Sequence, residues 1–338
     1  MRRPIDRRAF LRAVAAGGAV AAAGTLGVRA FLGEPEPWDD AAFPTPGSAR
    51  VAVLPASRYD SSLEAIVLDG LAAIGANVAG RNVLLKPNLV EFDPGTVINT
   101  DPRLVAATVE ALRLLGAAAV TVGEGPGHRR DVQDVVSRSG LLDALGEVKA
   151  PFVDLNADAV RRVPLRSRYT TLGELWLPQT VLGADVVISM PKMKTHHWAG
   201  VTLSLKNLFG CLPGRVYGWP KNVLHWAGIQ PSILDIAGAV RPRYAIVDGI
   251  VGMEGNGPIQ GDPVEVGVLV FGDDPVATDV VTASLMGLDP TLVPYLVEAG
   301  RFLGQSERER IVDAGEDPSR FARPFAPPPQ AGGSLTSG

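Results

Sequence analysis

The side chains best suited to chemistry gather in a few short segments of this sequence. The chain has six lysines against 26 arginines, so arginine supplies most of its positive charge. Only Lys149 lies away from these segments, and the remaining lysines and all histidines are Lys86, Lys192, Lys194, Lys206, Lys221, His128, His196, His197 and His225. Lysine is a compact cation whose pKa shifts readily, so this clustering favours a ligand site over solvated surface loops.

Most of these segments directly follow an apolar run that is typical of a buried β-strand. The runs and the polar segments after them are Asn82–Leu85 with Lys86–Asn88, Val120–Val122 with Gly123–His128, Phe152–Val153 with Asp154–Asn156, Val186–Ser189 with Met190–His197, and Ala245–Val247 with Asp248–Gly249. If the strands are parallel, their carboxyl ends meet at one edge of the sheet, where open α/β sheets bind ligands. The order of the sequence therefore brings lysines, carboxylates and histidines to one crevice.

Helical periods separate these strands. Helices are expected at Ser61–Ile74, Asp101–Leu115, Asp131–Ser139, Ile233–Val240 and Pro275–Met286, and further strands at Arg50–Pro55, Tyr244–Val247 and Val264–Phe271. The alternation predicts an α/β fold, with a mostly parallel sheet, helices on both faces and long loops at the carboxyl ends of the strands.

The residue types suggest a division of roles at the predicted edge. Cations that would neutralise a carboxylate or phosphate, and polar groups that would orient it, are Lys86, Asn88, Glu124, Lys192, Lys206 and Asn207. His196 or Glu254 would move a proton, with Lys194 beside them as a catalytic group. The alternative is an internal salt-bridge network between the lysines and nearby carboxylates that needs no ligand.

A divalent metal is a further hypothesis for this edge. Asp248, Glu254 and His196 could supply its ligands, and carboxylates alone favour hard cations such as Mg²⁺ or Ca²⁺. A loop histidine with a structural hydrogen bond explains His196 equally well. Asp274, just before Pro275, matches a helix N-cap, and Gly123–Gly127 fits either a phosphate cradle or a tight turn.

The overall composition limits the class of protein. The chain is 46% apolar and 20% charged with a net charge of −4, which is typical of a globular protein without a basic stripe for nucleic acid. Cys211 is the only cysteine, so no internal disulfide can form. A cluster held by this chain alone is also excluded, because an iron–sulfur cluster usually needs four thiolates.

The N-terminal residues 1–30 have the order of a signal segment. Asp6–Arg12, with the Arg7-Arg8 pair, resembles a twin-arginine translocation motif, and an Ala/Gly-rich stretch follows at Ala13–Val28. The expectation is export by the twin-arginine translocation machinery to the periplasm or cell envelope, with an uncleaved membrane anchor as the alternative. After a linker at 31–49, residues 50–304 are expected to form a single α/β domain, and 324–338 a disordered tail.

Several segments together resemble the domain-of-unknown-function family 362. They are Lys86–Asn88, Met190–His196, Thr202–Gly210, Asp248–Gly255 and Asp274–Asp279, within a stretch from about Val51 to Gly300. The resemblance implies a shared site without naming a substrate. Some members of the family carry ferredoxin-like cysteine segments and are described as iron–sulfur proteins, and this sequence lacks those segments.

Three functions remain open at this point. The first is an exported enzyme or ligand-binding domain that acts on a small anionic molecule. The second is a redox-associated accessory protein that works with an iron–sulfur partner. The third is a non-catalytic binding module of the cell envelope. A bound small molecule would favour the first, and co-purification with a ferredoxin-like protein the second.

Overall fold

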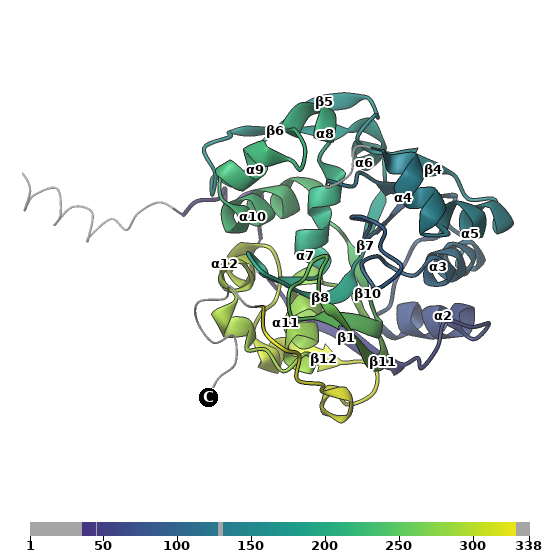
Figure 1. Ribbon diagram of the computed structural model, residues 1–338. Helices are drawn as coiled ribbons and strands as arrows, with labels where there is room; N and C mark the ends of the chain where they lie inside the picture. Colours follow the sequence, from purple (N-terminus) through teal and green to yellow (C-terminus); the bar gives the residue numbers. More distant parts are fainter. Residues whose placement is uncertain (1–35, 45, 128–130, 329–338) are drawn as a thin grey trace, which may run out of the picture. The chain divides into compact units, whose positions relative to one another are not determined.

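A computed structural model describes residues 36–44, 46–127 and 131–328, and its core is one large sheet (Figure 1). The strands are β1 Ala49–Pro55, β2 Asn82–Pro87, β3 Ala119–Glu124, β4 Phe152–Asp154, β5 Val160–Pro164, β6 Glu174–Pro178, β7 Val186–Met190, β8 Lys192–His196, β9 Gly200–Thr202, β10 Tyr244–Glu254, β11 Asp262–Gly272 and β12 Ile311–Asp313. The main sheet has 10 strands, in the order β12-β1-β11-β10-β7-β2-β3-β4, and off this path β8 pairs with β10 and β9 pairs with β8. β5 and β6 form a separate two-stranded sheet.

Helices connect most of the strands. They are α2 Leu63–Ala73, α3 Pro102–Leu114, α4 Val132–Arg138, α5 Leu141–Glu147, α6 Gln179–Leu182, α7 Ser204–Asn207, α8 Gly214–Tyr217, α9 Asn222–Trp226, α10 Ile229–Val240, α11 Pro275–Leu285 and α12 Pro294–Phe302, with 3₁₀ turns η1 Leu208–Cys211, η2 Pro290–Leu292, η3 Arg308–Arg310 and η4 Pro318–Phe321. Two of them begin as the sequence predicts, because Asp101 and Asp274 cap α3 and α11 and a proline follows each cap. No helix in the described ranges is both long and apolar enough to span a bilayer.

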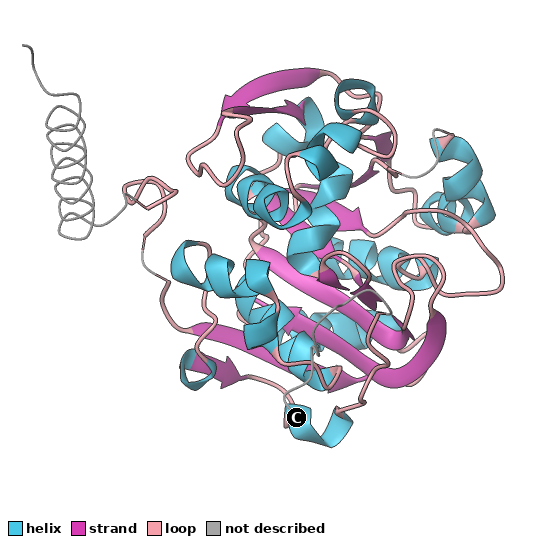
Figure 2. Ribbon diagram, turned by 60° about the vertical axis from the view of Figure 1, so that its left-hand side comes forward, coloured by secondary structure: helices cyan, strands magenta, loops and turns pink. Residues whose placement is uncertain are grey.

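Helices lie on both faces of the sheet (Figure 2). Alternate residues of the strands supply two separate hydrophobic cores, one on each face. In β2, Leu84 faces the core that contains α10, α11 and α12, whereas Val83 and Leu85 face the core that contains α2 to α5. The period of two follows from the pleat of a strand, which points successive side chains to opposite faces. A sheet buried on both faces requires helices on both faces, and this prediction is confirmed.

The sheet is mostly parallel, as predicted. Strands β10, β7, β2, β3 and β4 run parallel to one another, and β11 is antiparallel to both β10 and β1. From β2 the chain moves outward to β3 and β4, and β7 then returns to the opposite side of β2. The two strands pair with Lys86 opposite Ser189 and Pro87 opposite Met190. This reversal of strand order leaves a crevice at their carboxyl ends, the usual ligand position in open α/β sheets.

Two polar segments that the sequence suggested as loops are strands instead. The Lys192–His196 segment forms β8, which pairs with β10 on one side and β9 on the other. The glycine-rich segment after Val247 continues β10 to Glu254. Gly252 suits this strand because a Cβ there would collide with the ring of Phe325 and the carbonyl oxygen of Met193. Glycines here give room for close packing rather than flexibility.

Parts of both predicted unstructured segments pack against the domain. In the expected linker, the Trp38 ring stacks on Phe302 with centroids 4.9 Å apart. In the expected tail, Phe325 is buried in the core, and the Ala326 amide donates to the Glu254 carboxylate at 2.7 Å. These positions are therefore ordered, although their proline-rich composition suggested disorder. In each segment one large aromatic residue packs against the domain and holds the chain in place. The predicted signal segment lies outside the described residues.

Candidate functional site

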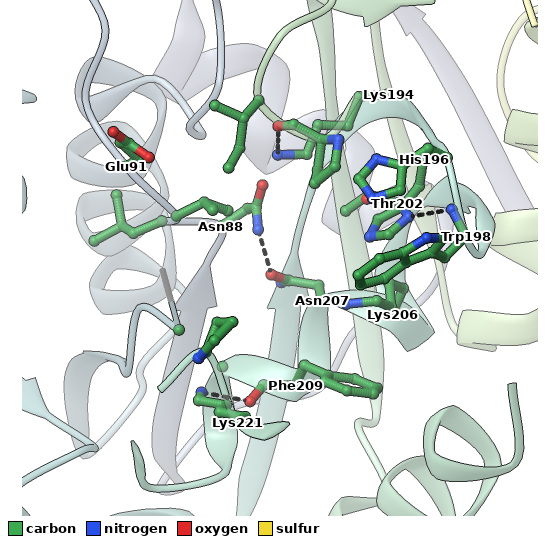
Figure 3. Close-up of a pocket in the computed structure, with 18 of the residues that line it drawn as sticks. Asn88, Glu91, Lys194, His196, Trp198, Thr202, Lys206, Asn207, Phe209 and Lys221 are labelled. Carbon is green, nitrogen blue, oxygen red and sulfur yellow. Dashed lines mark hydrogen bonds between the residues drawn. The ribbon is translucent and has the colours of Figure 1, made fainter. Parts of the chain in front are cut away.

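A cavity of about 600 Å³ opens at the carboxyl ends of β2 and β3 (Figure 3). Predicted site residues that line it are Asn88, Glu124, Lys194, His196, Lys206 and Asn207. They come from β3, β8, α7 and the segment after β2, so the fold brings together residues that are far apart in the sequence. The predicted edge therefore contains a real hollow, of a size that suits a small molecule.

A buried ion pair supports the floor of this cavity. The Lys86 ammonium contacts the Glu124 carboxylate, and it also donates to the Asn207 side-chain oxygen at 3.0 Å. Glu124 further accepts from the amides of Leu89 at 3.2 Å and Gly125 at 2.8 Å. Lys86 itself does not line the cavity, so its role in the structure is to fix Glu124 and Asn207. The Gly125 amide, a candidate phosphate donor, is already occupied by this carboxylate.

The ion pair also orients the amide of Asn88. Because the Lys86 ammonium can only donate, the oxygen of Asn207 must face it, and Asn207 Nδ2 donates to the Lys86 carbonyl at 3.0 Å. Asn88 Nδ2 donates to the same Asn207 oxygen at 3.2 Å, which turns Asn88 Oδ1 the other way (Figure 3). Asn88 Oδ1 is buried, and it has no hydrogen-bond partner in the described part of the chain. A buried acceptor in this state is costly unless a ligand or water meets it.

Three cavity lysines lack the carboxylate partner that Lys86 has. Lys194 and Lys221 are buried and donate only to backbone carbonyls, and Lys206 lies with its ammonium 3.9 Å from the centre of the Phe209 ring. No carboxylate within residues 36–44, 46–127 and 131–328 forms an ion pair with any of the three. The cavity wall therefore carries three lysines that form no ion pair among the described residues, although the carboxylates of Glu91, Asp93 and Glu124 also line it.

Burial lowers the pKa of each of these lysines. Burial, with a smaller contribution from neighbouring lysines, brings the pKa of Lys206 and Lys221 to about 7. Burial, then the nearby Lys206 charge, lowers the pKa of Lys194 well below its usual value. Glu124 acts in the opposite direction on all three but does not offset the burial. Lys206 and Lys221 therefore gain or lose a proton near neutral pH.

Two histidines of the cavity wall, His196 and His225, differ in which ring nitrogen carries the proton. Backbone amides of Trp198 and Ala199 donate to His196 Nδ1 at 3.1 and 3.2 Å, so the proton of the neutral ring is on Nε2. Burial, followed by the Lys206 charge, lowers the pKa of His196 well below its usual value. His225 Nδ1 lies 3.0 Å from the Lys221 carbonyl and must donate to it, which leaves its Nε2 as an acceptor. His196 is thus a hydrogen-bond donor, and His225 an acceptor, on one wall.

Lys192 and Asp248 lie apart from this cavity. The Lys192 ammonium is 2.8 Å from Asp248 and 2.9 Å from the Tyr59 hydroxyl, and it lines a smaller hollow of about 130 Å³. Asp248 also accepts from the Tyr59 hydroxyl at 2.7 Å and the Asp101 amide at 2.9 Å. Every partner in this network is internal, so these residues match the structural alternative rather than a ligand site.

The residues considered for a metal do not converge. Asp248 is paired with Lys192, Glu254 accepts from the Ala326 amide, and His196 Nδ1 is occupied by backbone amides. The described ranges hold no group of three or more His, Cys, Asp or Glu side chains arranged for a metal ion. Cys211 is buried, which raises the pKa of its thiol to about 12. His128 lies outside the described residues.

The cavity also contains residues that were not assigned to the predicted site. Thr202, opposite Lys194 in the pairing of β8 and β9, is buried, and its hydroxyl has no hydrogen-bond partner among the described residues. Trp198, Phe209 and Lys221 line the wall as well. The clustering of lysines in the sequence already suggests that Lys221 belongs to the site. The alternation of Lys194 and His196 with apolar or small residues could have indicated that this segment is a strand. No sequence signal marks Thr202.

Comparison with known proteins places these features in a family. The family model described as "Domain of unknown function (DUF362)" matches residues 83–284. The "Thylakoid-associated protein sll1697" of Synechocystis sp. (strain ATCC 27184 / PCC 6803 / Kazusa) is 33% identical over 249 residues, which cover 70% of this chain and 72% of that protein. The lactate racemase apoprotein from Thermoanaerobacterium thermosaccharolyticum aligns at 13% identity and a TM-score of 0.40, covering 67% of this chain and 55% of that chain.

Proposed function

This chain belongs to the DUF362 family, and we propose that its large cavity binds a small anionic molecule such as a carboxylate or phosphate compound. One observation carries the proposal: Lys194, Lys206 and Lys221 line a single cavity, buried or half-buried, without carboxylate partners in the described ranges. In their protonated forms Lys206 and Lys221 repel one another in this poorly solvated site, and a bound anion would remove that cost.

The remaining polar groups would orient such an anion. The Thr202 hydroxyl and His196 Nε2–H are donors, and Asn88 Oδ1 accepts from a hydroxyl group of the ligand. His196 and Lys194 are the candidates for moving a proton, since both line the cavity. Glu254 has no part in this proposal, because its carboxylate holds the Ala326 amide outside the cavity.

Export is a second part of the proposal. The Arg7-Arg8 pair and the Ala/Gly-rich stretch that follows it support translocation through the twin-arginine machinery to the periplasm or cell envelope. That machinery carries folded proteins, which agrees with a domain whose cores use residues from Trp38 to Phe325. No observation favours an iron–sulfur partner, and the redox-accessory role is not proposed.

Thermal shift with inorganic phosphate, sulfate and small carboxylates at low salt tests the anion site. An anion at about 100 times its dissociation constant should stabilise the protein by roughly 2.7 kcal/mol. Lys206→Met should weaken this effect and leave the melting temperature of the free protein unchanged or higher, because it removes an uncompensated cation. Lys149→Met is the matched control, since Lys149 is exposed and lies outside the cavity. The absence of any shift with every anion class would contradict the proposal.

A further inference from the structure

The nitrogen atom of Lys194 has an unusual set of neighbours for a buried lysine. Lys194 Nζ donates to the carbonyl oxygens of Ile98 at 2.8 Å and Pro258 at 3.2 Å, and the side chain is fully buried. An amine nitrogen has four tetrahedral positions. Here Cε and the two donated hydrogens fill three of them. The fourth position holds a third proton in the ammonium form or a lone pair in the amine form.

The surroundings of Lys194 favour the amine form. No carboxylate in the described ranges pairs with it, in contrast to Lys86 and Lys192. Burial lowers its pKa first, and the charges of Lys206 and Lys192 lower it further. The remaining lone pair belongs to a side chain that lines the 600 Å³ cavity. A desolvated amine beside other cations is the arrangement that activates lysine as a nucleophile.

Groups suited to a reacting carbonyl oxygen lie in the same part of the cavity. Thr202 is directly opposite Lys194 in the β8–β9 pairing, and its buried hydroxyl has no partner in the described chain. His196 follows Lys194 on the same face of β8 and carries its proton on Nε2. Both can donate to an oxygen on which negative charge develops. Figure 3 shows Lys194, His196 and Thr202 gathered on one side of the cavity.

We propose that Lys194 is a nucleophile that forms an imine with a small anion carrying an aldehyde or ketone group, such as a 2-oxo carboxylate. This rests on the proposed function, because Lys206 would hold the anionic group while the carbonyl reaches Lys194. The amine lone pair forms the new C–N bond, and the C=O electron pair moves to oxygen. Both hydrogens of the amine end on that oxygen, which leaves as water when C=N forms. No oxidant or reductant is required.

Borohydride trapping tests this step on the full-length chain. The protein is incubated with glyoxylate or pyruvate and sodium borohydride, which reduces an imine to a stable secondary amine, and peptides are mapped by mass spectrometry. We expect labelling at Lys194 to exceed that at exposed Lys149 by about tenfold or more, because a lysine of ordinary pKa is almost fully protonated at neutral pH. Lys194→Arg should abolish the main adduct, and Lys149→Arg should not change it.

A second variant covers the case in which Lys194→Arg fails to fold. Thr202→Val keeps the nucleophile and the lysines but removes the hydroxyl opposite Lys194, so labelling of Lys194 should become slower. Lys221, which also donates to two backbone carbonyls, is an internal comparison in the same spectra. Labelling that favours Lys221 or Lys149, or no trapped adduct at all, would overturn the proposal.

The outcomes also separate this inference from the anion site. If phosphate, sulfate and non-carbonyl carboxylates stabilise the protein but no adduct forms, the imine is wrong and the anion site stands. If Lys194 is labelled but no anion shifts the melting temperature, the nucleophile stands and anion binding in the cavity is wrong.

Discussion

Lys192 and Lys194 are neighbours on β8, yet their ammonium groups have opposite kinds of partner. Lys192 is 2.8 Å from the Asp248 carboxylate, whereas Lys194 donates to two backbone carbonyls beside the large cavity. One sequence motif therefore contributes a structural ion pair and a candidate reactive amine. The irregular pairing between Asp248 and Met253 on β10 separates the two environments.

This difference predicts different effects of removing a lysine on stability. Lys192→Met leaves the buried Asp248 without its cation and should reduce the free energy of unfolding by roughly 3–5 kcal/mol. Lys206→Met should have little effect or stabilise the protein, since no carboxylate depends on it. Chemical denaturation of both variants beside Lys149→Met is the measurement. Equal losses for Lys192 and Lys206 would show that the two classes of lysine do not differ.

The lowered pKa of Lys206 predicts a pH dependence with a definite sign. Its pKa is about 7 in the folded chain and near its ordinary 10.5 when unfolded, so unfolding takes up a proton between these values. The cost of the buried charge is present in full below pH 7 and is relieved as pH rises above it. Wild type should therefore gain stability relative to Lys206→Met between pH 6 and about 8.5.

Measuring the difference between the two proteins cancels titrating groups that do not interact with Lys206, whereas Lys194, Lys221 and His196 interact with its charge and contribute to the difference. Asp279, whose pKa burial raises to about 7, changes with pH in both proteins alike, as does the buried Cys211 thiol. Anion binding should show the opposite trend and weaken as pH rises, because the ammonium form holds the anion. A stability difference that does not change with pH would contradict the low pKa of Lys206.

At the scale of elements, the 3₁₀ turn η1 sits directly against the ends of β2 and β3. Gly210 in this turn lies so close to the Lys86–Glu124 pair that a Cβ atom would overlap the Glu124 carboxylate and press on the Lys86 ammonium. Gly210 also lines the cavity. The turn can close the cavity floor only because this position has no side chain.

Gly210→Ala should therefore reduce the free energy of unfolding by about 1–3 kcal/mol, and by more if the buried ion pair opens. The matched control is Gly146→Ala in α5, where a Cβ meets no atom within 4 Å. Alanine is the better helix former, so this control should be neutral or stabilising by about 0.5–1 kcal/mol. Thermal unfolding of both variants checks the prediction, and equal stability of the two would contradict it.

At the scale of the whole molecule, we expect the α/β domain to provide the cavity and the N-terminal segment to direct export. The domain buries residues from Trp38 to Phe325 in its cores, and the arginine pair lies well before it in the sequence. Replacing both Arg7 and Arg8 with lysine keeps the charge, yet the protein should remain in the cytoplasm if the twin-arginine machinery reads the pair itself. Fractionation of cells expressing each form is the measurement. Lysine at Arg2 and Arg3 is the control and should leave export intact, and unchanged export of the Arg7-Arg8 variant would remove the assignment.

The sequence by itself determined the class of fold and the edge of the sheet at which the cavity forms. Strand and helix patterns are local, because pleat and helical period act over neighbouring residues, and they predicted β2, β3, β7 and α3 in close to their observed positions. The carboxyl ends of parallel strands must share an edge, so Asn88, Glu124 and Lys194 could be expected near one another before any contact was known.

Only the tertiary structure decided which polar groups face the cavity and which face one another. Lys192 forms an ion pair with Asp248, whereas Lys194 donates to the backbone carbonyls of Ile98 and Pro258, although the two lysines have similar local sequence. The difference arises because these partners lie far away in the chain. The Glu254 carboxylate likewise accepts a hydrogen bond from the Ala326 amide, a partner that is distant in the sequence. Whether two charged side chains form an ion pair depends on contacts of a few ångströms between segments that are distant in the sequence. The residue pattern along one strand therefore cannot predict which ion pairs form.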